Sequence, residues 1–463
     1  MGQGNVPLVV PARYPQLYTA VRDTAQQMIY LLRRALADPP QWPARSAQHV
    51  VFRNGGNAGT EEVVEECPGD AISRVYAELA GTEEFRQAVR ELERLAAEGR
   101  AIPHFFGVER TYLTPILTSY LDLQRSLDFD EGKFRVAYYQ VEDYLGAETA
   151  STRLYLELRG LSGSLDEVIL SETHRIYRLD EAEVNRLWRR MVPHAGYPFV
   201  GSFRVWPPLR SYVLEGTIRY PKGEAGDLGV FINDENVKAT RTLRLSAAGA
   251  GPVRLLTYEP VGFSPEMGRF MFPELIQPGK YLYELDEGSS AEIKKHWPYA
   301  YDLASSLQKA PDKLPTHLRI SGLRFSNSFD KPANEDQLID YSIAFEALFT
   351  KENDAVSYRL PLRAAIFVGD TPDERRKVFA VAHAAYVQRS NLAHGHNQLE
   401  DRVKVGAAKM SAAELLRDLQ SILFKSIHRF LQCSKTSTKD VILRAIDNAV
   451  ISMDRSELTR LWS

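Results

Sequence analysis

The sequence predicts an α+β multidomain protein in which a helical segment and a mostly antiparallel β region precede an all-α, up-and-down helical bundle. Short segments with β-branched and aromatic residues recur between residues 131 and 290, and Gly, Pro, Asp and Asn separate most of them, as expected of strands and turns. From residue 318 onward, apolar residues recur at helical spacing and the connections are short, which indicates a bundle. A chain of 463 residues is long enough for about two or three such domains.

We expect four parts along the chain: a mainly helical segment (1–130), the mostly β region (131–290), a helix and linker (291–317), and the bundle (318–463). In the first part, apolar spacing predicts helices over residues 18–37, 71–79, 83–98 and 113–123, and a short strand over 50–52. The glycine-rich stretch 54–60 is not followed by the Lys-Ser/Thr pair of a phosphate-binding loop, so we interpret it as a plain loop.

The β region contains eight predicted strands and one predicted helix. The strands cover residues 134–140, 152–159, 168–170, 199–206, 211–220, 230–233, 241–245 and 253–258. The helix covers 179–191, with Asp180 as N-cap. Arg186, Arg189 and Arg190 form a basic edge on this helix, which we interpret as a solvated flank in preference to a phosphate contact. The region holds no catalytic constellation that we can recognise, and we expect it to sense or regulate.

The bundle begins after a predicted helix over 298–308, with Pro298 in its first position. Its own helices are expected over residues 336–349, 360–367, 372–394, 411–431 and 439–452. Two of them have capping boxes: Thr371 with Glu374, and Ser411 with Glu414. The capping boxes fix where these two helices begin.

Composition excludes several classes of protein. The net charge is −3, and from Glu335 to the end there are 18 Lys and Arg against 17 Asp and Glu, so any site for a polyanion must be local. The two cysteines, Cys67 and Cys433, lack metal-ligand spacing, which favours a reducing compartment. The chain has no long apolar run and no charged-then-apolar start. We therefore expect a cytoplasmic protein without a membrane span.

The helix opened by Thr371 ends in the sequence Arg389-Ser390-Asn391-Leu392-Ala393-His394, and Gly395 follows as a natural stop. Histidine suits proton transfer because its pKa lies near neutrality. Arginine suits a phosphate because its charged guanidinium binds two oxygens. Five residues at about 100° each place the two side chains roughly 140° apart on an ideal helix. They converge if the helix bends near Asn391, or if two chains share one site.

Four blocks of the bundle resemble the HEPN superfamily in its Apea-like branch, over roughly residues 318–435. The blocks are 335–348 (beginning Glu-Asp-Gln-Leu-Ile-Asp), 357–365 (Ser-Tyr-Arg-Leu-Pro-Leu-Arg-Ala-Ala), 386–395 with the Arg-x4-His motif, and the closing helix through Phe430 and Leu431. The resemblance implies a metal-independent endoribonuclease that needs no cofactor and acts as a homodimer on RNA. It also implies a bacterial setting, such as a toxin–antitoxin, abortive-infection or other antiphage system. The RNA, a phage-derived trigger and any antitoxin stay undefined.

On this resemblance, Arg389 and His394 are the expected catalytic residues, and Ser390 and Asn391 support the motif. The position after the arginine is usually Asn, Asp or His in the family, whereas this chain has serine. A separate set could orient or charge-balance the catalytic pair, or form a buried ion-pair cluster instead: Glu346, Arg359 and Arg363.

Three other interpretations stay open. His394 could merely cap a helix C-terminus and Arg389 could pair with Glu346 as structure. The bundle could be a catalytically inert HEPN module that binds nucleotides or serves as a dimerisation scaffold, which Ser390 favours. A metal site from His383, His394 and His396 lacks a Cys or acidic partner pattern, so we predict no metal.

Overall fold

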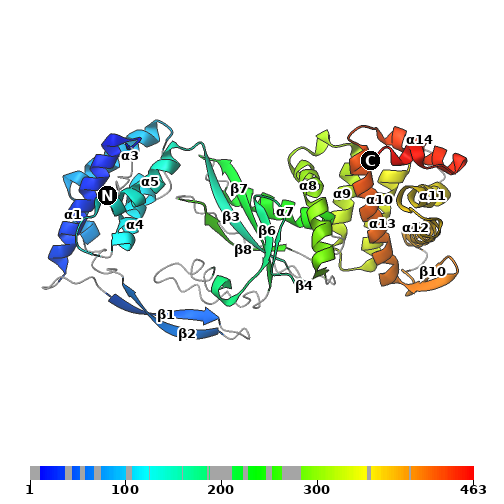
Figure 1. Ribbon diagram of the computed structural model, residues 1–463, viewed down its shortest axis with the longest axis horizontal. Helices are drawn as coiled ribbons and strands as arrows, with labels where there is room; N and C mark the ends of the chain where they lie inside the picture. Colours follow the sequence, from blue (N-terminus) through cyan, green and yellow to red (C-terminus); the bar gives the residue numbers. More distant parts are fainter. Residues whose placement is uncertain are drawn as a thin grey trace, which may run out of the picture.

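The structure is a computed structural model that describes residues 11–36, 44–52, 58–66, 75–100, 107–124, 126–158, 160–184, 187, 211–222, 228–246, 253–262, 283–351, 356–395 and 398–462. It is a mixed α/β protein whose parts lie in a row (Figure 1). N-terminal helices stand at one end, an antiparallel sheet lies in the middle, and the C-terminal helices stand at the other end. No helix among these residues is both long and apolar enough to cross a membrane.

Among the described residues, the N-terminal end contains a hairpin, a short helical segment over residues 75–79 and four longer helices. The longer helices are α1 (Pro15–Ala35), α3 (Glu83–Ala97), α4 (Thr114–Gln124) and α5 (Glu131–Gly146), with a π-helical turn over Glu109–Leu113 before α4. The hairpin pairs β1 (Ala44–Phe52) with β2 (Ala58–Glu66) in antiparallel fashion. Only part of β1 was expected from the sequence, and most of the glycine-rich stretch, residues 54–57, lies outside the described residues.

The strand predicted over 134–140 is wrong, because those residues belong to α5. Asp130 caps this helix by accepting a hydrogen bond from the backbone N–H of Lys133 at 3.0 Å. Phe134, Tyr138 and Val141 then recur at helical spacing and are all buried. The aromatic and β-branched residues that suggested a strand are thus the core-facing stripe of a helix.

The central sheet has the order β5-β6-β7-β3-β8 and is antiparallel throughout, as predicted. Its strands are β3 (Thr149–Leu158), β5 (Glu167–Ile169), β6 (His174–Arg178), β7 (Tyr212–Pro221) and β8 (Val253–Pro260). A separate parallel pair joins β4 (Leu161–Gly163) to β9 (Tyr283–Leu285).

Two further predicted strands, 230–233 and 241–245, are wrong, because both lie in one helix, α7 (Leu228–Ser246). Its buried residues Ile232, Ala239 and Leu243 form one helical face. Asp180 is an N-cap as predicted, since its side chain accepts from the backbone N–H of Glu183 at 2.8 Å. The strand expected over 199–206 and the basic edge Arg186, Arg189 and Arg190 lie outside the described residues.

The C-terminal part is almost entirely helical. It contains α8 (Glu287–Lys309), α9 (Thr316–Ser328), α10 (Asn334–Phe349), α11 (Val356–Val368), α12 (Pro372–Ala393), α13 (Ala412–Cys433), α14 (Lys439–Ser452) and α15 (Ser456–Thr459). A short hairpin, β10 (Arg402–Val405) and β11 (Ala408–Ser411), interrupts the helices and was not expected. Pro298 lies inside α8 and does not begin it, because Asp286 and Ser289 form a capping box earlier in the chain.

Helices α11 and α12 are seen nearly along their axes in Figure 1, while α13 runs across the view. This pair therefore crosses α13 steeply, and the helices are not all aligned in the predicted up-and-down manner. The bundle core is aromatic: Phe349, Phe367 and Phe430 contact one another with ring centroids 4.7 to 5.7 Å apart. The predicted division of the chain into four parts stays a prediction.

Helices α7 and α8 connect the sheet region to the bundle. Ile293 and Trp297 of α8 belong to the core shared with the sheet, whereas Leu303 and Leu307 belong to the bundle core. Arg244, at the end of α7, is buried and donates to both carboxylate oxygens of Asp330, at 2.9 and 2.6 Å. Because one helix contributes to both cores, the joint between the two parts is tightly packed.

A buried histidine of α13 completes this joint. His428 Nε2 lies 2.6 Å from the backbone carbonyl oxygen of Leu245, and its ring centroid lies 4.0 Å from that of His296. Burial, with the neighbouring His296 and Lys295 adding to it, lowers the pKa of His428 to about 4, although the hydrogen bond to Leu245 opposes the shift. The folded joint thus holds a neutral imidazole.

We expect this joint to weaken in mild acid. Between pH about 6.5 and 4 the unfolded chain protonates this histidine and the folded chain does not, so stability falls as pH falls through that window. When the pH is lowered from 7 to 5, the free energy of unfolding of His428→Gln should fall by ~2 kcal/mol less than that of the wild type. Urea titrations at the two pH values measure it. His383 is exposed, so the free energy of unfolding of His383→Gln should fall by as much as that of the wild type. Equal losses in all three proteins would contradict the role assigned to His428.

Candidate functional site

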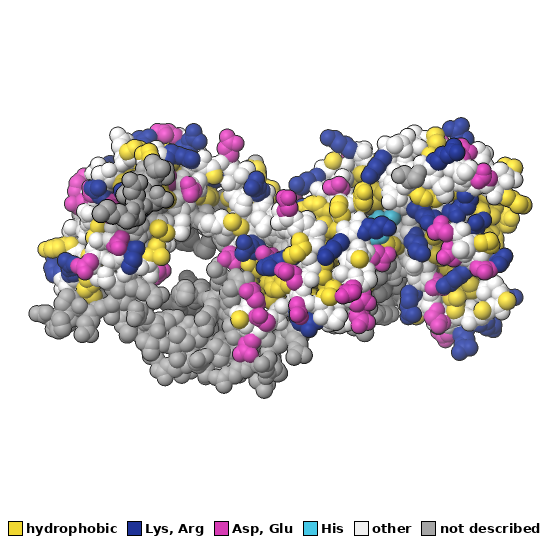
Figure 2. Space-filling view, in the orientation of Figure 1, with side chains coloured by type: hydrophobic (Ala, Val, Ile, Leu, Met, Phe, Trp, Pro, Cys, Tyr) yellow, Lys and Arg dark blue, Asp and Glu magenta, His cyan; other side chains and the backbone are white. Residues whose placement is uncertain are grey.

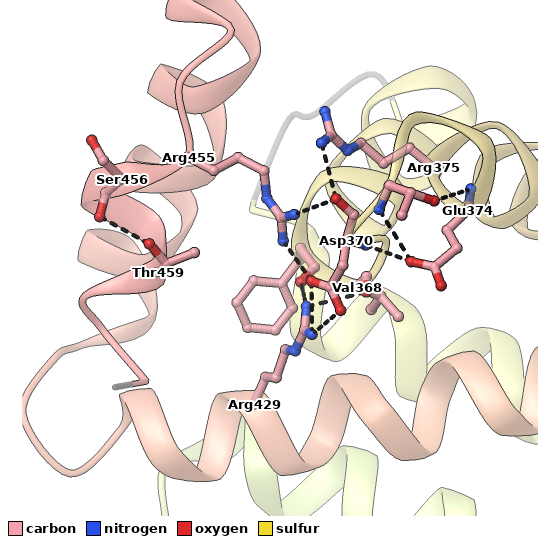
Figure 3. Close-up of polar contacts among 10 residues, drawn as sticks. Val368, Asp370, Glu374, Arg375, Arg429, Arg455, Ser456 and Thr459 are labelled. Carbon is pink, nitrogen blue, oxygen red and sulfur yellow. Dashed lines mark hydrogen bonds and ion pairs between the residues drawn. The ribbon is translucent and has the colours of Figure 1, made fainter.

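The start of α12 is firmly anchored, which fixes the helix that carries the Arg-x4-His motif. Thr371 and Glu374 form the predicted capping box: each side chain accepts from the other's backbone N–H, both at 3.2 Å. Just before them, Asp370 accepts from the guanidinium of Arg429 on α13, at 3.1 and 3.0 Å, and from Arg455, at 3.4 Å (Figure 3). Partial burial would raise the pKa of Asp370, but these arginines outweigh it and lower the pKa.

Arg389 lies on the flank of α12 that faces α10. Its guanidinium Nη2 lies 3.6 Å from Oε1 of Glu346, and both side chains are about one-third exposed, 31% and 28%. Glu346 also lines a shallow pocket with Phe345 and Tyr386, which encloses about 10 Å³, room for roughly one water. Because the pair is loose and partly in water, a negatively charged ligand could compete with Glu346 for the arginine.

His394 is the C-cap of α12, where its backbone N–H donates to the carbonyl oxygen of Ser390 at 3.1 Å. Gly395 follows with φ +69°, a conformation that glycine adopts easily, and ends the helix as predicted. The helix is α-helical through Ala393, so no break at Asn391 brings the two motif side chains together. His394 is exposed and lies seven and eleven residues after Val387 and His383, hence on their face of the helix.

The supporting residues fall into two groups. Ser390 and Asn391 are half-buried in the last turns of α12, beside the catalytic candidates, and Arg359 is exposed on α11. Arg363 is 2% exposed and donates to both carboxylate oxygens of Asp447, at 2.8 and 2.9 Å, and to the backbone carbonyl of Phe349, at 2.7 Å. Arg363 therefore ties α11 to α14 and α10. Its carboxylate partner, Asp447, was not among the residues considered from the sequence.

An aromatic ridge stands beside the motif on the exposed face of α11 and α12. Tyr358, 59% exposed, contacts Phe379 edge-on at 6.0 Å between ring centroids, and Phe379 stacks on His383 at 6.0 Å. Val387 extends the ridge toward His394 and is 39% exposed. Phe379 itself is partly buried and also packs against the bundle core. This ridge was not expected from the sequence, although the spacing of Phe379, His383 and Val387, which continues to His394, could have indicated it.

The remaining candidates carry little chemistry. Burial raises the pKa of the Cys433 thiol to about 12, which leaves it unreactive, and Cys67 lies outside the described residues. Among the residues that the structure describes, no group of three His, Cys, Asp or Glu side chains could hold a metal. His396, the third member of the weighed histidine site, lies outside them.

Basic side chains are more frequent than acidic ones over the bundle on the face seen in Figure 2, with hydrophobic side chains among them. A local basic face of this kind suits a polyanion even though the bundle is nearly neutral overall.

In comparisons with known proteins, no family model, curated protein or solved structure matches the chain.

Proposed function

We propose that the protein is a metal-independent endoribonuclease of the HEPN type, a toxin or effector of bacterial antiphage or abortive-infection defence. The observation that carries the proposal is the exposed end of α12. His394 is exposed there, and Arg389 lies five residues earlier in a loose pair with Glu346 that is about one-third exposed. Neither side chain is committed to the core, unlike Arg363.

The chemistry follows from these two residue types. His394 accepts the proton of a ribose 2′-hydroxyl, whose oxygen attacks the adjacent phosphorus, and a histidine donates a proton to the departing 5′-oxygen. Arg389 stabilises the charge that develops on the phosphoryl oxygens. The products are a 2′,3′-cyclic phosphate and a 5′-hydroxyl, and no metal is required. Two histidines serve the two proton transfers, so a complete site contains two copies of the chain.

The homodimer is the first part to test. On α12, Arg389 faces α10 while His394 shares the exposed face of Val387, so a second copy across a two-fold axis can supply the missing side chain. The aromatic ridge would be buried between the copies. We expect light scattering at micromolar concentration to give a dimer, and Val387→Glu to give a monomer without RNA cleavage.

The matched control is Val441→Glu on α14, because Val441 and Val387 have almost the same exposure, 37% and 39%. This variant should stay dimeric and active. A wild-type monomer that cleaves RNA would exclude the composite site. A dimer that survives Val387→Glu would place the contact elsewhere.

The alternative is a catalytically inert HEPN module that binds nucleotides or serves as a dimerisation scaffold, and Ser390 is the residue that favours it. Serine keeps a polar hydroxyl but is smaller than the Asn, Asp or His that is usual in the family. Ser390→Asn restores a common family residue. If the wild-type protein cuts no RNA and Ser390→Asn does, the wild-type protein is the scaffold. If both cut, serine is compatible with catalysis.

The residues before the bundle are proposed to regulate this activity. They form a large share of the chain and reach the bundle through α7 and α8, which contribute Leu245, Leu303 and Leu307 to its core. A change in the packing of this joint would shift α9 and α13, which pack against α10 and α12.

A further inference from the structure

A cavity of about 210 Å³ lies where β7, α7 and α8 meet, far along the chain from the Arg-x4-His motif. The cavity lies near the first residue of β6, His174. Just before that residue, the backbone carbonyl oxygen of Thr173 accepts from the backbone N–H of Thr217 at 3.0 Å. Among the described residues, β6 pairs with β7 only up to Gly216, whereas β3 pairs with β7 on the other side as far as Pro221. The cavity lies beside Thr217, Ile218 and Arg219 of β7, between this strand and the helices α7 and α8.

The inner wall of the cavity is a buried polar cluster around Glu235. Its carboxylate Oε1 accepts from the Tyr301 hydroxyl at 3.2 Å and lies 3.3 Å from Nε2 of His174, and its other oxygen pairs with Lys238. The Lys238 ammonium also lies 4.3 Å from the centroid of the Tyr301 ring. A Cβ on Gly216 would come within 2.9 Å of the His174 ring, so glycine admits the histidine. A buried network this complete holds the wall rigid.

The outer wall of the cavity carries two basic side chains. Arg219 of β7 and Lys309 at the end of α8 both line the cavity and are exposed. Among the described residues, neither has an ion pair or a side-chain hydrogen bond. Thr217 and Gln308 add a hydroxyl and an amide beside them, and Asp234 adds a carboxylate.

We propose that this cavity binds a phosphorylated small molecule with a flat ring, of about mononucleotide size. Arg219 and Lys309 would hold the phosphate, because a guanidinium offers paired donors and an ammonium a point charge. The ring of Phe231, which lines the cavity, would offer apolar surface to the flat part, and Asp234 would accept from a ligand hydroxyl or amino group. The cavity is smaller than the roughly 300–1,000 Å³ of pockets for drug-sized ligands, which limits the ligand to one ring system and few phosphates.

The site also has a route to the bundle. Its two helical walls are α7 and α8, and these same helices carry Arg244, which pairs with Asp330, and Leu303, which packs in the bundle core. A ligand that bridges β7 to both helices would therefore stabilise the joint. Binding itself does not rest on ribonuclease activity, so the two proposals can fail separately.

The test is calorimetric titration of AMP into the full-length wild-type protein and three variants. We expect AMP to bind, and Arg219→Gln and Lys309→Gln each to weaken it by about tenfold or more. Lys294→Gln is the matched control, because Lys294 is also exposed on α8 but does not line the cavity. It should bind AMP as the wild type does. Adenosine, which lacks the phosphate, should bind at least about tenfold more weakly.

The outcomes separate cleanly. No heat with AMP at millimolar concentration would overturn the proposal. So would undiminished binding to Arg219→Gln and Lys309→Gln, or adenosine that binds as tightly as AMP. Inorganic pyrophosphate that binds as tightly as AMP would remove the ring from the proposal. Circular dichroism spectra of the variants that match the wild type exclude misfolding as the cause of a loss.

Discussion

His394→Ala should lower RNA cleavage by on the order of a hundredfold or more, because general acid–base catalysis contributes roughly that much. The fold should be unaffected: the side chain is exposed at the C-cap of α12, and the capping contacts come from its backbone. Purified variants are compared on total RNA by gel assay, with melting temperatures alongside. Products should carry a 2′,3′-cyclic phosphate, and EDTA should not inhibit.

The control is Lys377→Ala, which removes an exposed charge from the same helix near its other end. It should cleave within a few-fold of the wild type. If His394→Ala cuts as well as the wild type, the histidine is only a helix cap and the site assignment is wrong. If His394→Ala melts well below the wild type, the loss of activity carries no information about proton transfer, and His394→Gln becomes the variant to compare.

Local signals in the sequence predicted much of the bundle. Thr371 and Glu374 are three residues apart, and the capping box that they form begins α12 where expected. Gly395 ends the same helix with a positive φ. The last long helix, Lys439–Ser452, has the predicted bounds. These elements are read correctly because each depends on residues within one or two turns.

The errors have a common physical origin. In α5 and α7, aromatic and β-branched residues such as Phe134, Tyr138 and Ile232 resemble strand residues in short windows, and packing decides which structure they adopt. The cavity around Glu235 was missed for a related reason. Its partner His174 is 61 residues away, and a single sequence contains no signal for such a contact.

The types of residue in the candidate site could be predicted from the sequence. Which of these charged side chains pair with one another was harder to predict. Arg389 and Glu346 come together across α12 and α10 at 3.6 Å, as weighed from the sequence. Arg363 was a supporting candidate together with Glu346, but the structure gives it a partner 84 residues later, Asp447. The burial of an arginine, which separates these two cases, depends on the packing of four helices and cannot be read from spacing.

Arg363→Ala should therefore lower the free energy of unfolding by about 2 to 4 kcal/mol. The buried guanidinium makes two hydrogen bonds to Asp447 and one to the carbonyl of Phe349. Its removal leaves that carbonyl without its donor and opens space between α11 and α14. Urea titration followed by tryptophan fluorescence measures the loss, and Arg363→Met, which fills more of the space, shows how much of the loss is due to the cavity.

Arg389→Ala is the matched comparison, because it removes the same type of side chain from an ion pair that is about one-third exposed. Its stability should change by less than about 1 kcal/mol, while its RNA cleavage falls as far as that of His394→Ala. Arg363→Ala, assayed well below its unfolding midpoint, should instead retain most of its cleavage. Loss of Arg363 would then lower mainly the stability, and loss of Arg389 would lower mainly the rate of RNA cleavage. Equal stability losses would mean that Arg389 is a structural residue, and the phosphate contact would have to come from elsewhere.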